Sequence, residues 1–221
     1  MVKAMGLREH NARRNRELIL DAALALFHER GYDDTTLEQV AERAEVSIST
    51  LYRYFPTKDL LVLSPVALDR QMALKLASRP ADEPLDIALG HAVMALLSSP
   101  RAGNQRLQQV RRIAYTSEHL RDRLRQQFVR ERIALQEAVA ARLGRDKDDI
   151  YCSMVARSAV AVLELAGARA AGADQTDSDD QPFLDEALRV MRTLQEEQPA
   201  FPRYIEPTSA DQGLGTATPA G

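Results

Sequence analysis

Residues 36–61 read TLEQVAERAEVSISTLYRYFPTKDLL, and two helix-start signals divide this stretch. The first is a capping box, formed either by Thr36 with Gln39 or by Thr35 with Glu38, in which each side chain bonds the backbone N–H of the other residue. The apolar residues that follow recur at helical spacing and form one buried face: Leu37, Val40, Ala41 and Ala44. The stretch therefore opens with a short amphipathic helix.

The second signal is Ser47, whose hydroxyl can accept a free backbone N–H at the start of another short helix. This helix extends to about Phe55 and ends at Pro56. Leu51 and Phe55 point inward, whereas the other positions present hydroxyls, rings and one guanidinium: Ile48, Ser49, Thr50, Tyr52, Arg53 and Tyr54. Such an outer face suits a major groove lined by phosphates. The two helices therefore predict a helix-turn-helix that binds DNA.

Helices on either side complete a small predicted domain. Upstream, residues 13–30 carry an apolar face and end at Gly31, a residue suited to left-handed backbone after a helix. Downstream, Thr57 can cap the next helix, and Lys58 in its first turn would receive a phosphate oxygen together with free N–H groups. The predicted shared core contains Phe27, Tyr32, Val40, Val46, Leu51 and Phe55.

The segment from about Arg14 to Leu61 resembles the N-terminal DNA-binding domain of the TetR family of transcriptional regulators. The resemblance lies in the residues ILDAALALFHERGYDDTTLEQVAERAEVSISTLYRYFPTKDLL, where G-Y, T-T/L, A-x-x-A-x-V-S, T-L-Y-x-Y-F and K-D-x-L follow a helix in the family's order and spacing. It implies a homodimer with an all-helical C-terminal domain, and repression that ends when a small molecule binds to that domain.

The resemblance also implies which residues contact DNA. Ser47 would cap the recognition helix, and phosphates or base edges would be contacted by Thr36, Thr50, Tyr52, Tyr54 and Lys58. Ile48 could meet a thymine methyl group or be an ordinary exposed apolar residue, and Ser49 and Arg53 complete the predicted set. Glu45 stands where the family most often has Gly. Because neither Ile48 nor Ser49 offers a bidentate base contact, the operator sequence cannot be inferred.

Net charge does not indicate a DNA-binding protein, because the chain of 221 residues has a formal net charge of −3 and its first 60 residues are not basic either. The distribution of the cations supports a local basic edge. The cations cluster in Arg53, Lys58 and an N-terminal arm that contains Lys3, Arg8, Arg13, Arg14 and Arg16. The arm resembles extensions that reach phosphate or a minor groove, with Arg13 and Arg14 as DNA contacts, or it is a solvated disordered terminus.

The chain divides into a flexible basic arm (1–12), a helix-turn-helix domain (13–60), a helical effector-binding and dimerisation domain (61–200) and a disordered tail (201–221). Beyond the DNA-binding unit, helices are expected at about residues 57–78, bent at Pro65, and at 85–97, 105–115, 117–143, 148–171 and 181–197. No segment shows convincing strand alternation, so the predicted fold class is all-α.

The single cysteine, Cys152, excludes an intramolecular disulfide and fits a reducing cytoplasm. It lies in an apolar helical run, which favours a buried inert thiol over a redox sensor. No uncharged apolar run is long enough to span a bilayer, and the first residues are too polar for a signal peptide. We therefore expect a cytoplasmic protein that does not bind a membrane.

The last two predicted helices are the expected dimer interface. The first is dense in small residues that allow close approach, among them Ala159, Ala166 and Gly167, and the second carries an apolar stripe with Leu184, Leu188 and Met191. Packing within one chain would produce similar stripes. A two-fold dimer would present two recognition helices to successive major-groove faces, so its operator would be a near-palindrome.

An effector cavity is expected among the helices that follow the DNA-binding domain. Its predicted lining is mostly apolar with a few polar groups: Met72, Leu76, His91, Met94, Val110, Ile113, Tyr115, Phe128, Met154 and Val162. Taken one at a time, each of these residues is better explained as part of the core. The thioethers and the scarcity of aromatic residues indicate an adaptable pocket for a hydrophobic or acyl-type effector.

Two other classes of function compete with a ligand-controlled regulator. An enzyme is disfavoured because the four histidines include no i, i+4 pair and no zinc-like spacing with Cys152, and no nucleophile elbow, P-loop or dinucleotide motif occurs. We expect no catalytic residues, cofactor or metal. A constitutive or architectural helical DNA-binding protein without an effector remains the alternative, and sequence-indifferent, salt-sensitive binding would favour it.

Overall fold

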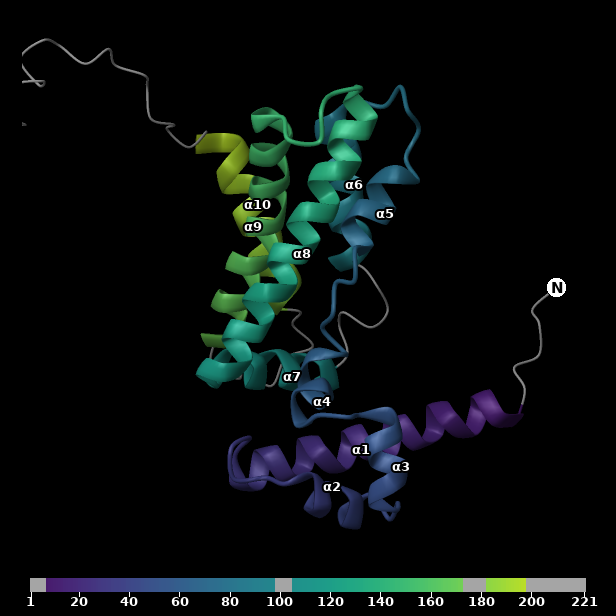
Figure 1. The fold of residues 1–221 in the computed structure, drawn as a ribbon. Coiled ribbons are helices and arrows are strands. Elements are labelled where there is room, and N and C mark those ends of the chain that lie inside the picture. Colours follow the sequence, from purple (N-terminus) through teal and green to yellow (C-terminus); the bar gives the residue numbers. More distant parts are fainter. Residues whose placement is uncertain (1–6, 98–104, 173–181, 198–221) are drawn as a thin grey trace, which may run out of the picture.

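The computed structural model describes residues 7–97, 105–172 and 182–197, and this part of the chain contains helices and no strand (Figure 1). In order they are α1 (Leu7–Arg30), α2 (Leu37–Arg43), α3 (Ile48–Tyr54), α4 (Lys58–Leu63), α5 (Gln71–Ala77), α6 (Leu85–Leu97), α7 (Gln105–Thr116), α8 (Glu118–Leu143), α9 (Ile150–Gly172) and α10 (Pro182–Glu197). The all-α fold class is confirmed. The predicted tail, 201–221, lies outside the described residues.

The helices form a small N-terminal unit and a larger bundle. In Figure 1, α1, α2 and α3 lie together at one end, and α4 and α7 lie between them and the bundle of α5, α6, α8, α9 and α10. The long helix α8 packs against both α5 and α9, and α10 packs against α9. Of the predicted core of the N-terminal unit, Phe27, Tyr32, Val40, Leu51 and Phe55 are buried, and Val46 is partly buried against them.

The capping box that opens α2 is the one formed by Thr36 and Gln39. The Gln39 N–H donates to Thr36 Oγ1 over 3.3 Å, and the Thr36 N–H donates to Gln39 Oε1 over 3.0 Å. Thr35 has another role, since its hydroxyl is buried and donates to the Gly31 carbonyl over 2.8 Å. Ser47 caps α3 as predicted, accepting the Thr50 N–H over 3.2 Å.

The turn between α2 and α3 places Glu45 in left-handed backbone, at φ 53°. The Val46 N–H then donates to the Ala41 carbonyl over 3.0 Å, which closes the end of α2 and turns the chain toward Ser47. A residue with a Cβ adopts this conformation at a cost of about 1 kcal/mol. The turn has the geometry for which the family's more usual glycine is suited, and it forms here with glutamate in its place.

The N-terminal helix is longer than predicted, because α1 begins at Leu7 and not at Arg13. Residues 7–12 contain neither glycine nor proline, so nothing in the sequence stops the helix from continuing toward the N-terminus. Arg13 and Arg14 therefore belong to a helix, where both are exposed and Arg13 lies 3.8 Å from Glu17. Half of the proposed arm is ordered helix, and residues 1–6 lie outside the described part.

The predicted single helix over residues 57–78 is wrong, because α4 and α5 are separate helices. Pro65 lacks an N–H and so cannot continue the hydrogen-bond ladder after Ser64, whose own N–H donates to Leu60. Further along, Asp69 and Arg70 adopt left-handed backbone, with φ of 43° and 59°. Left-handed backbone at these two residues departs from helical geometry, so residues 64–70 form a connector between α4 and α5.

The other expected bounds agree with the structure within two residues, and α8 ends at Gly144 as predicted. By length and composition α9 could cross a membrane, with a mean hydropathy of 1.4 over its most apolar stretch. Here it packs between α8 and α10, and it buries Cys152, Ala156 and Leu163. These contacts are those of the core helix of a bundle.

Candidate DNA-binding surface and ligand cavity

The outer face of α3 is a polar surface backed by a buried one. Leu51 and Phe55 are buried against the rest of the N-terminal unit. Ile48 and Tyr52 are 38% and 43% exposed, and Ser49 and Arg53 are also exposed. The short helix thus holds four neighbouring side chains clear of the protein, where a major groove could receive them.

Tyr54 is flanked by two guanidinium groups from different helices. Arg53 lies over the Tyr54 ring at 5.0 Å from its centroid, and Arg16 of α1 lies over the same ring at 5.6 Å. Sequence analysis placed Arg16 in the arm and did not pair it with α3, because the contact joins residues far apart in the chain. The arrangement gathers two cations and a phenol hydroxyl at one edge of the recognition helix, a set suited to DNA phosphates.

Lys58 makes contacts inside the N-terminal unit that the sequence did not predict. Its ammonium donates to the carbonyl oxygens of Tyr32, Asp33 and Thr35, over 2.9, 3.2 and 3.0 Å, and lies 4.3 Å from the centroid of the Tyr32 ring. An ammonium has three N–H donors, and all three are used within the domain. A phosphate contact would require the ammonium to release one of these carbonyls, so the predicted DNA contact of Lys58 stays a prediction. These bonds hold the loop that precedes Thr36 and the start of α2.

The neighbouring Asp59 joins the N-terminal unit to the bundle. Its carboxylate accepts the Tyr32 hydroxyl over 2.7 Å and the Arg123 Nε–H over 3.2 Å, and lies 2.9 Å from His119 Nε2. His119 and Arg123 are on α8, whereas Tyr32 precedes α2. The Asp59 side chain is only 15% exposed. Burial opposes its ionisation, but the hydrogen bonds from Tyr32, His119 and Arg123 outweigh burial and hold the pKa of Asp59 below its ordinary value.

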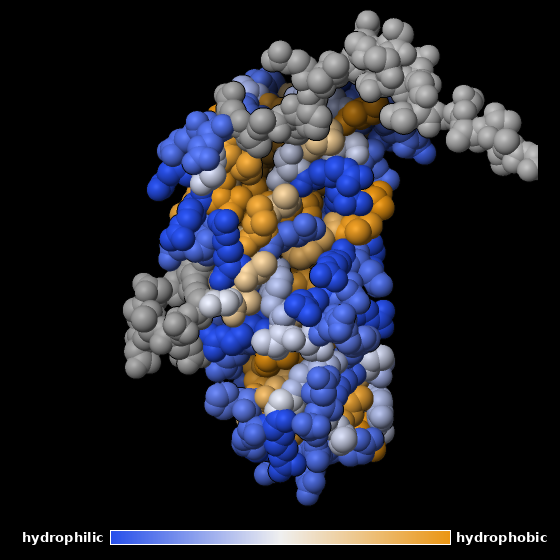
Figure 2. All heavy atoms as spheres, turned by 90° about the vertical axis from the view of Figure 1, so that its left-hand side faces the viewer, coloured by the Kyte–Doolittle hydropathy of each residue, from blue (hydrophilic) through white to orange (hydrophobic). Residues whose placement is uncertain are grey.

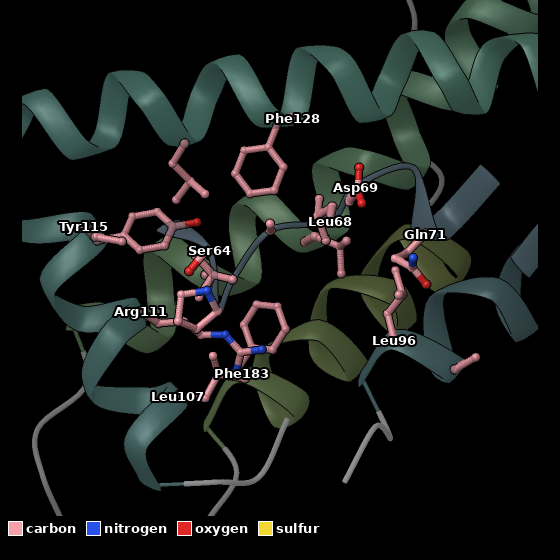
Figure 3. Close-up of a pocket in the computed structure, with 18 of the residues that line it drawn as sticks. Ser64, Leu68, Asp69, Gln71, Leu96, Leu107, Arg111, Tyr115, Phe128 and Phe183 are labelled. Atoms are coloured by element: carbon pink, nitrogen blue, oxygen red, sulfur yellow. The ribbon is translucent and has the colours of Figure 1, made fainter. Parts of the chain in front are cut away.

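A cavity of about 610 Å³ lies inside the larger bundle, next to the connector (Figure 3). Its walls come from the connector and from α5 to α10, and it is lined by Ser64, Pro65, Val66, Ala67, Leu68, Asp69, Gln71, Lys75, Ala95, Leu96, Leu107, Arg111, Ala114, Tyr115, Leu124, Phe128, Leu163, Gly167 and Phe183. This volume is in the range of small-molecule sites in proteins. Most of the lining is apolar, and polar groups stand at its two sides.

One side of the cavity carries Arg111, Tyr115 and Ser64, and the opposite side carries Asp69 and Gln71 (Figure 3). The Arg111 guanidinium stacks on the Phe183 ring, 3.8 Å from its centroid, and burial lowers the pKa of Arg111 to about 10. Burial raises the pKa of Tyr115 to about 12. At neutral pH the guanidinium is therefore charged and the phenol is a neutral donor.

Comparison with known proteins adds to this geometry. Residues 19–64 match the model described as "Bacterial regulatory proteins, tetR family", and residues 83–195 match the "MftR C-terminal domain". The regulator TcmR of Streptomyces glaucescens is 34% identical to this chain over 170 residues, which are 73% of this chain and 74% of TcmR. The chain belongs to the TetR family. It is therefore a DNA-binding transcriptional regulator.

Other TetR relatives share only part of the molecule or only its fold. The repressor KstR of Rhodococcus jostii is 52% identical over 52 residues, or 24% of each chain. The crystal structure of NalD, the secondary repressor of the MexAB-OprM multidrug efflux pump in Pseudomonas aeruginosa, superposes with a TM-score of 0.52 at 22% identity, covering 83% of this chain and 96% of NalD. At that identity NalD supports the TetR fold alone.

The cavity of about 610 Å³ is lined by only two of the predicted effector residues, Tyr115 and Phe128. Met72, Leu76 and Val110 are fully buried core, and Ile113 packs against that core. The remaining predicted residues line other hollows. His91 and Met94 belong to a hollow of about 390 Å³ between α5 and α6, and Met154 and Val162 belong to a groove between α6, α9 and α10.

The cavity residues that sequence analysis missed come mainly from the connector, α7 and α10: Ser64, Pro65, Val66, Leu68, Asp69, Leu107, Arg111 and Phe183. The left-handed Asp69 and Arg70 that shape the connector leave no periodic signal in the sequence. Arg111 was a weak sequence signal for the cavity, because it is a cation in a short helix whose other face is apolar.

The predicted dimer residues fall into two groups. Ala166 is fully buried, and a Cβ at Gly167 would overlap the Tyr115 hydroxyl, so both belong to the interior of one chain and not to a dimer interface. Ala159, Leu184, Leu188 and Met191 remain at least partly accessible. Ala159 and Met191 line the groove between α6, α9 and α10, which has a volume of about 470 Å³. Figure 2 shows apolar residues gathered on the face of the bundle that holds α9 and α10.

Proposed function

We propose that this chain is a homodimeric repressor that a small hydrophobic or acyl-type ligand releases from a near-palindromic operator. The observation that carries the proposal is that one wall of the cavity is the connector that continues from α4, the helix containing Lys58 and Asp59. A ligand in the cavity therefore contacts the segment that links the bundle to the DNA-binding unit. Ligand binding in the cavity and operator binding by the DNA-binding unit then influence each other through this shared wall.

A second route joins the same two sites through α8. Leu124 and Phe128 of α8 line the cavity, and Arg123 on the same helix bonds Asp59. A shift of α8 that accommodates a ligand would therefore move the partner of the Asp59 carboxylate. Asp59 also accepts the Tyr32 hydroxyl, next to the loop held by Lys58. Coupling of about 1 to 3 kcal/mol between the sites would weaken operator affinity roughly 5- to 150-fold.

The dimer is proposed through the accessible apolar face of α9 and α10. Tyr151 and Met154 are 51% and 41% exposed, and the neighbouring Met191 and Leu194 line the same groove. Large exposed apolar patches of this kind mark interaction sites. A two-fold axis at this face would place two α3 helices on the same side of the dimer, where a palindromic site in duplex DNA can meet both.

The test is selection of bound fragments from a random double-stranded DNA library, comparing the natural chain with a variant that carries Tyr52→Ala and Arg53→Ala. Both residues are exposed on α3, so the variant is expected to fold. Lys147→Ala, in the loop between α8 and α9, is the matched surface control. We expect the natural chain and the control to enrich one near-palindrome that the double variant fails to recover.

The enriched fragment then becomes the probe for ligands that lower its affinity. Sequence-indifferent, salt-sensitive binding without enrichment would contradict the proposal and favour a constitutive or architectural DNA-binding protein. A folded monomer at the concentrations that bind DNA would contradict the proposed dimer and leave the operator contact intact.

A further inference from the structure

Two hollows meet beside α5. The hollow of about 390 Å³ is lined by Lys75, Ser78, Arg79, His91, Met94 and Ala95, and the main cavity of about 610 Å³ is also lined by Lys75 and Ala95. Because the two share these residues, they are adjacent spaces with a common border between α5 and α6. That border is where the apolar interior of the cavity approaches solvent, since both Lys75 and Ala95 are exposed.

The basic side chains around this border differ in how they are paired. Arg79 Nε donates to Glu83 Oε2 over 2.8 Å, and His91 Nε2 lies 3.7 Å from Glu83 Oε1. Within the described part of the chain, no ion pair involves Lys75, although it stands between the two hollows. An anion at the border would therefore meet one ammonium that has no carboxylate of its own.

The rest of the main cavity suits a hydrocarbon chain. Leu68, Leu96, Leu107, Leu124, Phe128, Leu163 and Phe183 supply apolar walls beyond Lys75. A ligand with a charged head and an aliphatic tail could bury the tail there and leave the head near solvent, where the desolvation of its charge costs least. A fully apolar ligand would make the same apolar contacts and would gain nothing from the Lys75 ammonium.

We infer that the cavity binds an aliphatic carboxylate, with the carboxylate at Lys75 and the chain directed toward Phe128 and Tyr115. This inference rests on the proposed ligand cavity and names the chemistry and orientation of its ligand. Arg111 defines the competing orientation, because it stands with Tyr115 on the side of the cavity opposite Asp69 and Gln71 (Figure 3). A carboxylate at Arg111 would reverse the chain.

The experiment is calorimetric titration of the full chain with dodecanoate and with dodecanol, which have the same chain and differ in the charge of the head group. We expect dodecanoate to bind about fivefold more tightly, the size of one partly exposed ion pair. Lys75→Gln should remove that preference and leave dodecanol binding unchanged. The preference should also shrink as salt is raised.

Two further variants distinguish a carboxylate bound at Lys75 from one bound at Arg111. Lys147→Gln removes an exposed lysine from the loop between α8 and α9, away from the cavity lining, and should leave both affinities unchanged. Arg111→Gln tests the reversed orientation. If Arg111→Gln abolishes the preference for dodecanoate and Lys75→Gln does not, the inference is wrong.

Equal binding of the two probes by the natural chain would also overturn the inference, and so would the absence of binding by either probe. Neither result touches the proposed function, which is measured by operator selection and by ligand-dependent release of that operator. Conversely, tight and Lys75-dependent dodecanoate binding that leaves operator affinity unchanged would support the binding site and count against control of DNA binding through it.

Discussion

The surface of α3 and the cavity of the bundle differ in how their residues come together. The recognition surface uses one short run of sequence, Ser47 to Phe55, and its exposed and buried faces follow from helical spacing alone. The cavity combines a connector with residues from six helices, so few of its members are neighbours in the chain. A site built from local contacts can be recognised from sequence, and a site built from distant ones needs the packed structure.

The substitutions with the largest expected effect test whether the DNA-binding unit and the bundle unfold independently. Leu51 and Leu135 are both fully buried, one in the N-terminal unit and one in the bundle. Leu51→Ala and Leu135→Ala should each cost about 2 to 5 kcal/mol of unfolding free energy, because each leaves a cavity. We expect Leu51→Ala to abolish operator binding and to preserve ligand binding, measured by calorimetry. Parallel loss of both activities would show that the two regions unfold as one.

The next effect separates structural from DNA-contacting cations in the N-terminal unit. Lys58→Met removes three hydrogen bonds to carbonyl oxygens and should lower stability by about 1.5 to 3 kcal/mol. Arg53→Ala, on the exposed face of α3, should change stability by less than about 0.5 kcal/mol. Chemical denaturation measures both values.

Salt dependence of operator affinity distinguishes the same two variants. If Arg53 contacts a phosphate, Arg53→Ala should reduce the slope of log affinity against log salt by about 1, whereas Lys58→Met should leave the slope unchanged. A reduced slope for Lys58→Met would show that the ammonium leaves its three carbonyls and contacts DNA.

A smaller effect concerns the junction between the two regions. The pKa of Asp59 is lowered in the folded protein, so its ionised form stabilises the fold above the unfolded pKa of about 3.9, and this contribution is lost as pH falls through the folded pKa. Asp59→Asn should therefore be destabilising at pH 7, and its difference from the natural chain should shrink below about pH 4. Thermal unfolding at a series of pH values checks this.

The same variant tests the proposed coupling. If the bonds from Asp59 to His119 and Arg123 transmit the effect of a ligand, Asp59→Asn should reduce ligand-induced release of the operator while ligand affinity stays the same. Arg125→Gln is the matched control, because Arg125 is an exposed residue of α8 that pairs with Asp122 and not with α4. Full release by Asp59→Asn would exclude this route and leave the connector as the link.

The smallest effect lies in the turn of the helix-turn-helix. Glu45→Gly removes the strain of a Cβ in left-handed backbone, a gain of about 1 kcal/mol that the greater freedom of glycine in the unfolded chain partly offsets. We expect a small increase in stability and unchanged operator affinity. A marked loss of stability would show that the Glu45 side chain has a role that backbone conformation does not explain.

Sequence alone determined the all-α fold, the cap at Ser47 and most helix bounds, because hydrophobic periodicity and capping depend on residues three or four positions apart. For α2 it left two capping boxes open, and the structure selected the one formed by Thr36 and Gln39. It also revealed the resemblance to the TetR family, since the motifs lie in one continuous segment. Its errors at Leu7 and Pro65 concern helix continuity, where neighbouring residues permit more than one outcome.

Only the tertiary structure decided how distant residues are paired. The three acceptors of the Lys58 ammonium lie 23 to 26 positions away, and the partners of Asp59 lie 27 to 64 positions away. Gly167 proved to be the point where Tyr115 approaches α9, and not a contact between subunits. Such contacts depend on the relative placement of whole helices, which is set by the packing of the entire core and leaves no local pattern in the chain.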